Sequence, residues 1–174
     1  MRLFLYFRKS IPRFRGIGQG PHGIPHSVPK QRLYRQPLRH SRRASSPCRG
    51  NLQKPVWRKI SEVEPIGPKK LLDILIIAPC TGNTLAKLSH SIADTSVTMA
   101  VKSHLRNARP VLIAVSTNDG LAGAAENIGR LLSRKHIYFV PFGQDDPIKK
   151  PTSLVADFSR IPEAMNAAVQ GIQL

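Results

Sequence analysis

Three short apolar runs constrain the fold of this chain more than any other feature of its sequence. They are LLDILIIAP at 71–79, PVLIAVS at 110–116 and HIYFVPF at 136–142. Each is a continuous run without the apolar–polar alternation of a half-exposed strand. Such runs are typical of strands that are covered on both faces, as in parallel sheets. We therefore expect three buried, parallel strands.

Helical patterns fill the gaps between these runs, at 83–93, 95–108 and 120–135. The first repeats apolar residues at helical spacing, and its candidate N-cap is Asn83 or Thr84. Asp94 is the candidate cap of the second pattern, which ends before Pro110. The third is rich in small residues and can pack closely on a sheet. The alternation of strands and helices predicts an α/β fold, a doubly wound half-domain with a parallel sheet and flanking helices.

The C-terminal segment 152–171 continues the helical pattern. It predicts either one helix broken before Pro162 or two helices. Pro162 suits a first helical position, and Gly171 suits the position just past a helix end.

Polar residues follow the first two apolar runs at the point where each strand should end. Thr81, Asn83 and Thr84 stand at a helix start, where free backbone N–H groups can hold phosphate or another polar ligand, and Gly82 permits close approach. Ser116, Thr117, Asn118 and Asp119 follow the second run. Because parallel strands end at the same edge of a sheet, both groups should face one crevice. The alternative is a capped helix with no ligand.

Other candidate residues carry weaker signals. Cys80 is either a nucleophile activated by the helix start or, as the sequence favours, a small buried residue. We expect His90, His104 and His136 to be surface or half-buried histidines rather than metal ligands. The loop after the third run holds Asp145, Asp146, Lys149 and Lys150, and we expect it to be solvated.

The net charge of +17 belongs almost entirely to one third of the chain. Residues 1–59 carry 15 Lys or Arg and no Asp or Glu, whereas residues 61–174 carry 12 basic and 10 acidic residues. Eight of the 15 prolines fall in this first segment or just after it. The composition predicts disorder in 1–59. A nucleic-acid-binding arm, a mitochondrial transit peptide and a plain tail would each fit it, and so would translation in a frame that is not the native one.

The two cysteines, Cys48 and Cys80, predict neither a disulfide framework nor a Cys-x-x-Cys metal site, which fits a reducing, intracellular compartment. No run reaches the roughly 18 apolar residues that a membrane span requires.

The segment APCTGNTLAKLSHSIAD resembles the Pro-Ala-Ser-Ala-Asn-Thr motif of the flavoprotein family, the flavin-binding cysteine-decarboxylase-like proteins. The resemblance extends over residues 60–174 through LRNARPVLIAVSTNDGL and HIYFVPFGQDDPIKKP. It implies a Rossmann-like flavoprotein fold and FMN as cofactor. The flavin-contacting positions that it implies lie in two groups: Pro79, Cys80, Thr81, Gly82, Asn83 and Thr84, and then Ser116, Thr117 and Asn118.

The likeness is greatest to a branch of the family that takes part in making dipicolinic acid in the mother cell of sporulating bacteria. It implies an oligomeric cytoplasmic protein, an oxidoreductase-type synthase component that works beside an NAD(P)-binding partner. It implies no membrane and no nucleic-acid partner, and a non-catalytic module with an Arg-rich nucleic-acid-binding arm is the alternative. Decarboxylase chemistry does not carry over, because the second motif keeps only its Asn, at Asn118.

The family begins with a Gly-rich strand and turn that holds the phosphate, and residues 1–59 contain nothing similar. An out-of-frame stretch before Ile60 would explain this, and family members also continue past the position of Leu174. A sheet without that first strand should expose an edge and an apolar face. We therefore expect marginal stability and weak or absent flavin binding for the chain as written.

Overall fold

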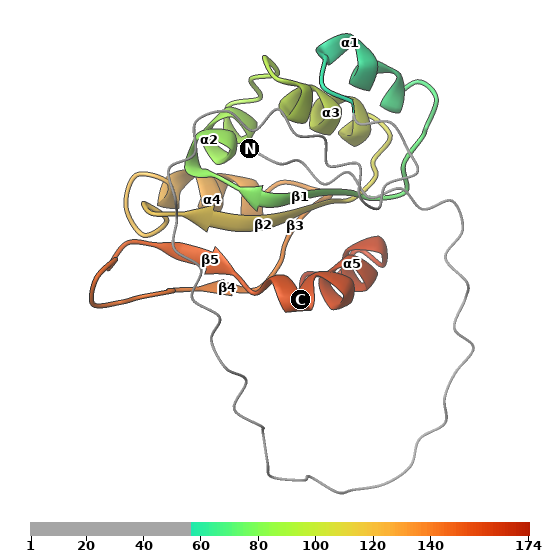
Figure 1. The fold of residues 1–174 in the computed structure, drawn as a ribbon. Coiled ribbons are helices and arrows are strands. Elements are labelled where there is room, and N and C mark those ends of the chain that lie inside the picture. The colour runs from blue at the N-terminus through green and yellow to red at the C-terminus, as the bar shows by residue number, and fades with distance from the viewer. Residues whose placement is uncertain (1–56) are drawn as a thin grey trace, which may run out of the picture. The chain divides into compact units, whose positions relative to one another are not determined.

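The computed structural model describes residues 57–174, so Cys48 and the rest of the segment 1–56 lie outside the described residues. Twelve helices and strands follow one another in this part of the chain (Figure 1). They are α1 (Ile60–Val63), η1 (Glu64–Ile66), β1 (Leu75–Cys80), α2 (Gly82–Ser89), α3 (Ser96–Leu105), β2 (Val111–Thr117), α4 (Ala125–Leu132), β3 (Ile137–Phe139), β4 (Phe142–Gly143), β5 (Leu154–Ala156), η2 (Phe158–Arg160) and α5 (Ile161–Val169). No helix among the described residues is long and apolar enough to cross a bilayer.

The sheet is built around β2, which confirms the predicted parallel sheet. β1 pairs with β2 in parallel, with Leu75 opposite Val111, and β3 pairs in parallel with the first half of β2. The second half of β2 pairs with β5 in the antiparallel direction, and β5 in turn pairs with β4. The sheet is therefore mixed: a parallel core continues into a short antiparallel hairpin at the end where β1 and β2 finish.

The third apolar run does not form one strand over 136–142. It forms β3 and β4, separated by Val140 and Pro141. Proline has no N–H to donate to a strand ladder, so it is confined to strand ends and edges. Its carbonyl still accepts a bond from the Asp157 N–H at 2.8 Å, which ties the start of the hairpin to the chain after β5.

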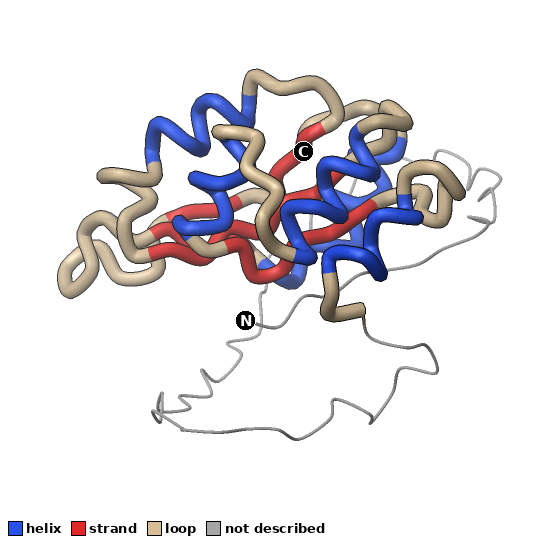
Figure 2. The backbone as a smooth tube through the Cα atoms, turned by 90° about the horizontal axis from the view of Figure 1, so that it is seen from above, coloured by secondary structure: helices blue, strands red, loops and turns tan. Residues whose placement is uncertain are grey.

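Two apolar cores lie on opposite faces of the sheet. Alternate residues of β1 point to each face: Leu75 and Ile77 join the core under α2, α3 and α4, whereas Ile74 and Ile76 join the core under α5. In Figure 1, α5 lies on one side of the strands and the other helices on the opposite side, and Figure 2 shows the helices lying across the strands. Coverage of both faces explains why the apolar runs show no alternation.

The edge predicted for β1 is present, because among the described residues β1 pairs only with β2. The predicted exposure of its apolar face is wrong. Five of its six residues are buried, and only Pro79 is partly exposed. Helices cover both faces of the sheet here, so the unpaired element is the backbone edge of β1.

Several helix boundaries differ from the prediction. Thr95, not Asp94, caps α3: its hydroxyl accepts the Thr98 N–H at 3.2 Å. Asp94 instead pairs with Lys87 at 2.7 Å. The N-cap of α2 is Thr81 rather than Asn83 or Thr84. A charged partner in space thus displaced Asp94 from its expected role.

The C-terminal segment is only partly helical. Leu154–Ala156 is a strand, since it pairs with the end of β2, and it is too short to leave a periodic signal. Pro162 does lie in the first turn of α5, and Gly171 follows its end with φ of +80°, both as predicted. Glycine reaches this left-handed conformation without the steric cost of a side chain.

Candidate functional site

The structure brings the ends of β1 and β2 together, as the sequence predicts. We call residues 79–84 and 116–119 the strand-end site. Cys80 lies opposite Val115 in the parallel ladder, so the loops that follow the two strands leave the sheet side by side. A Cβ placed on Gly82 would lie 2.8 Å from both Thr117 Oγ1 and Asp119 Oδ1. Only glycine permits this close approach of the two loops without moving either side chain.

The β1 half of the site presents the start of α2. Thr81 is extended at the N-cap, but its side chain makes no capping bond; its hydroxyl lies 3.3 Å from the Thr84 hydroxyl. The first amides of a helix have no acceptor within the helix, so Gly82 and Asn83 direct N–H groups outward. The Asn83 side chain is exposed and that of Thr84 is buried.

Pro79 and Cys80 shape the site rather than project into it. The Ala78–Pro79 peptide is cis, and the ladder to β2 is irregular between Ile77 and Cys80. The Cys80 side chain is fully buried, and burial raises the pKa of its thiol to about 12. The thiol therefore stays protonated, which confirms the small buried residue and argues against the nucleophile.

The β2 half of the site is held by β5. Ser116 and Thr117 pair with Val155 and Leu154 in the antiparallel ladder. Thr152 Oγ1 donates to the Asn118 carbonyl at 2.7 Å, and Ser153 Oγ donates to the Thr117 carbonyl at 3.3 Å. The prediction of helix over 152–171 concealed this clamp.

Asp119 is the one charged residue of the strand-end site. Thr117 Oγ1 donates a hydrogen bond to Asp119 Oδ1, which holds the carboxylate beside Gly82. The sequence predicted that Asp119 would face the crevice. Its contact with the start of α2 depends on the relative height of the two loops, which no local pattern encodes.

The chemistry of the donor set decides which part of a flavin fits. Hydroxyls, carboxamides and free helix amides suit the hydroxyls of a ribityl chain and the polar edge of a ring. A phosphate fits less well, because the site contains no Lys or Arg and holds the Asp119 carboxylate. Among residues 57–174, no cluster of three His, Cys, Asp or Glu could hold a metal ion.

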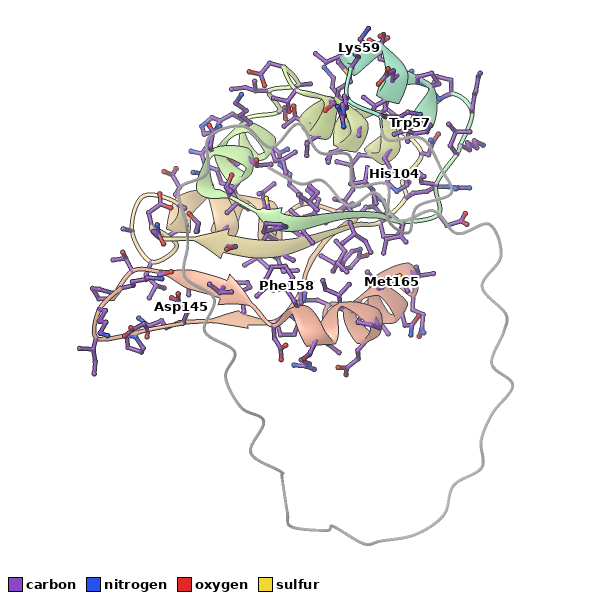
Figure 3. All side chains as sticks on the ribbon, viewed as in Figure 1. Trp57, Lys59, His104, Asp145, Phe158 and Met165 are labelled. Carbon is purple, nitrogen blue, oxygen red and sulfur yellow. The ribbon has the colours of Figure 1, made fainter. Side chains whose placement is uncertain are left out.

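A separate open cavity of about 400 Å³ lies along the β4–β5 hairpin and includes none of the predicted site residues. Its lining includes Phe142, Asp145, Asp157 and Arg160. Asp145 pairs with Lys150 at 3.2 Å, and hydrogen bonds from Ser153 and Lys150 lower the pKa of its carboxyl. The predicted solvated loop is thus confirmed as an exposed hairpin with internal pairing (Figure 3).

The predicted exposure holds for two of the three histidines. His90 is exposed and His136 partly so, whereas His104 is fully buried, contrary to prediction. His104 Nε2 donates to the Pro110 carbonyl at 3.0 Å, and within the described part of the chain Nδ1 has no partner. Desolvation is the main cause that lowers the pKa of this imidazole. It lies on α3, away from the strand-end site (Figure 3).

Comparison with known proteins agrees with this architecture. The chain is 48% identical over 115 residues to the B subunit of dipicolinate synthase from Bacillus subtilis (strain 168), a match that covers 66% of this chain and 58% of that protein. The crystal structure of the dipicolinate synthase B subunit from Bacillus halodurans superposes with a TM-score of 0.69 at 45% identity, over 70% of this chain and 63% of that one. The chain therefore spans less than two-thirds of the length of either relative.

The family model Flavoprotein matches residues 31–159, a range that begins before Ile60 and includes both halves of the strand-end site. Nearly three-quarters of the chain is covered by this match. The fold, the parallel strands and their adjacent polar ends agree with it. This chain belongs to the flavoprotein family.

Proposed function

We propose that this chain acts as the B subunit of dipicolinate synthase and contributes to the formation of dipicolinic acid during bacterial sporulation. The observation that carries the proposal is identity of 48% and 45% to two proteins of that name, together with the TM-score of 0.69 to the second. Identity at this level over a whole α/β core is far above what a shared fold alone requires.

Membership of the flavoprotein family supports a flavin as the cofactor, and we propose FMN. The residues that would hold it are the polar ones of the strand-end site: Thr81, Asn83, Thr84, Ser116, Thr117 and Asn118. Pro79, Cys80 and Gly82 would shape the backbone around it. A bound flavin supplies two-electron redox chemistry. The chain's own contribution would be to bind and orient the ring and the ribityl chain with hydroxyl, carboxamide and backbone groups.

The relatives are named as one of two kinds of chain in the synthase, which implies that each has a partner. For this chain we propose the A subunit of dipicolinate synthase as the partner, with the NAD(P) site on the A subunit. We also propose a homo-oligomer that works in the cytoplasm of the sporulating mother cell. No observation favours the nucleic-acid-binding alternative, since residues 61–174 are nearly neutral, with 12 basic and 10 acidic residues.

Co-expression tests the proposal directly. The 174-residue chain would be produced with a dipicolinate synthase A subunit in a host that makes no dipicolinic acid, and the acid would be measured in the extract. We expect more product than the host makes with the A subunit only, and less from a chain that carries Asn118→Ala. A matched control is Asn166→Ala, an exposed asparagine on α5. Product no higher than in the host without this chain, when the chain is shown to be folded, would contradict the proposal.

A further inference from the structure

The carboxylate of Asp119 occupies the place where the two halves of the strand-end site meet. It lies against Gly82 at the first turn of α2, at a distance of 2.8 Å from the position that a Cβ would take. It also lies near Gly123, whose Cβ position is 3.6 Å from Oδ2. Two glycines thus leave room for this one carboxylate, one on each side of it.

The backbone around Asp119 is fixed on several sides. Its carbonyl accepts the N–H groups of Ala122 at 2.9 Å and Ala124 at 3.0 Å. The preceding carbonyl, of Asn118, accepts the Thr152 hydroxyl at 2.7 Å. With Thr117 Oγ1 donating to Oδ1, the carboxylate has a defined position instead of a freely moving surface one.

One oxygen of this carboxylate is left for a ligand. Oδ1 is engaged by Thr117, and within residues 57–174 no donor lies within hydrogen-bonding distance of Oδ2. Asp119 is exposed, so a molecule in the strand-end site can reach it. An ionised carboxylate only accepts hydrogen bonds, and it does so strongly from hydroxyl or N–H donors.

The same charge disfavours an anion at this position. A phosphate group carries about 1.5–2 negative charges, and like charges brought close together raise the free energy of the complex. The start of α2 would attract an anion by itself. Its nearest negative group is already supplied by the chain, and no Lys or Arg of the site offsets it.

We propose that Asp119 is a specificity-determining residue of the strand-end site: it accepts a hydrogen bond from a hydroxyl or ring N–H of the flavin and keeps the phosphate out of this position. This inference rests on the proposed flavin site. It assigns the site to the uncharged part of the cofactor, and the phosphate must then lie elsewhere.

Riboflavin, which has no phosphate, is the decisive probe. Its binding to the 174-residue chain would be followed by fluorescence anisotropy and compared with Asp119→Asn. We expect the substitution to weaken riboflavin binding by about tenfold or more, as for the loss of a hydrogen bond to a charged group. Thr117→Val, which removes the hydroxyl that positions the carboxylate, should weaken it less. Glu163→Gln removes the same charge from α5 on the other face of the sheet, and it should leave binding within about twofold.

Two further ligands define the contact. Lumiflavin lacks the ribityl hydroxyls, so if Asp119→Asn leaves lumiflavin binding unchanged the donor is a hydroxyl, and if it weakens lumiflavin equally the donor is on the ring. Inorganic phosphate at millimolar concentration should not displace riboflavin from the unsubstituted chain. Displacement by phosphate, unchanged or tighter riboflavin binding by Asp119→Asn, or no riboflavin binding by the unsubstituted chain would each overturn the proposal. Dipicolinic acid formation is measured separately, so failure of the proposed function would be distinguished from failure of this assignment.

Discussion

The side-chain amide of Gln173 completes the free edge of β3 by pairing with the backbone of Phe139. The Phe139 N–H donates to Gln173 Oε1 at 2.8 Å, and Gln173 Nε2 donates to the Phe139 carbonyl at 2.7 Å. The carboxamide thus makes the two bonds that a neighbouring strand would make. Phe139 is 1% exposed, so its backbone has few other partners.

Gln173→Ala should therefore destabilise the protein by about 1–3 kcal/mol, the cost of leaving buried backbone groups without partners. Gln173→Glu should cost at least as much at neutral pH, because a carboxylate cannot donate to the Phe139 carbonyl. Urea unfolding, followed through the single tryptophan, Trp57, measures both. Gln170→Ala, at an exposed position nearby in sequence, is the matched control and should change the free energy of unfolding by less than about 0.5 kcal/mol.

Two glycine-to-alanine substitutions should change stability in opposite directions. A Cβ on Gly67 would lie 2.5 Å from the backbone carbonyl oxygen of Ser103, so Gly67→Ala must shift α3 and should cost about 1–3 kcal/mol. Gly129 lies within α4 with nothing within 4 Å of its Cβ position, so Gly129→Ala should stabilise by up to about 1 kcal/mol. Thermal unfolding of both variants checks this. A lower melting temperature for Gly129→Ala would show that the environment of α4 is wrongly described.

Buried His104 should make stability depend on pH in the mildly acidic range. Burial lowers the pKa of its imidazole below the ordinary 6.5, so the unfolded chain binds a proton more readily than the folded one. The contribution is complete above pH 6.5 and is lost as the pH falls from there toward the lower, folded-state pKa. Asp73 and Arg109 are the charged groups that act on it.

Urea unfolding at a series of pH values between about 5 and 8 tests this dependence. The free energy of unfolding should fall below pH 6.5 with a slope of at most about 1.4 kcal/mol per pH unit, the value for one proton. His104→Gln cannot titrate and should flatten the slope. Equal slopes in the two proteins would contradict the role of His104. Glu62 and Asp94, whose carboxyl pKa values are lowered from 4.5 and 3.8, act at lower pH.

At the strand-end site, Gly82→Ala should separate binding from stability. The new Cβ meets the ends of two side chains, Thr117 Oγ1 and Asp119 Oδ1, which can rotate away. We expect a change of under about 1.5 kcal/mol in the free energy of unfolding. Riboflavin binding should weaken, since the carboxylate moves. Calorimetric unfolding and riboflavin titration of the same variant would check both, and unweakened binding would count against the placement of Asp119.

We propose that residues 1–59 are not translated in the native frame of the domain at 60–174. The family-model match starts at residue 31, inside this segment, so a protein-level test is required. Peptide mapping of the product from its natural source should detect peptides of 60–174 and none from 16–30. Detection of the tryptic peptide GIGQGPHGIPHSVPK would exclude the proposal.

Hydrophobic runs predicted what depends on burial. The runs that contain Ile76 and Ile113 became parallel strands because coverage on both faces leaves continuous apolar sequence. The adjacency of the two polar strand ends followed from parallel topology alone. Sequence was a good guide wherever one local pattern had one structural cause.

The features that sequence failed to predict depend on partners distant in the chain. Leu154 lies in a strand because the end of β2 offers an edge, and Gln173 covers β3 from 34 positions away. His104 is buried by its place in α3, although its neighbours in sequence are polar. Asp94 left its capping role for Lys87. None of these choices is encoded in a window of ten residues.

The most direct test of the central claim uses a chimera, because the chain spans 58% of the Bacillus subtilis relative. Residues 60–174 would replace the matching part of that relative in a strain that lacks its own copy, and dipicolinic acid per spore would be measured. We expect that the chimera restores dipicolinic acid, and that it restores less when it carries Asn118→Ala. A folded chimera whose spores contain no more dipicolinic acid than those of the deletion strain would contradict the proposed function.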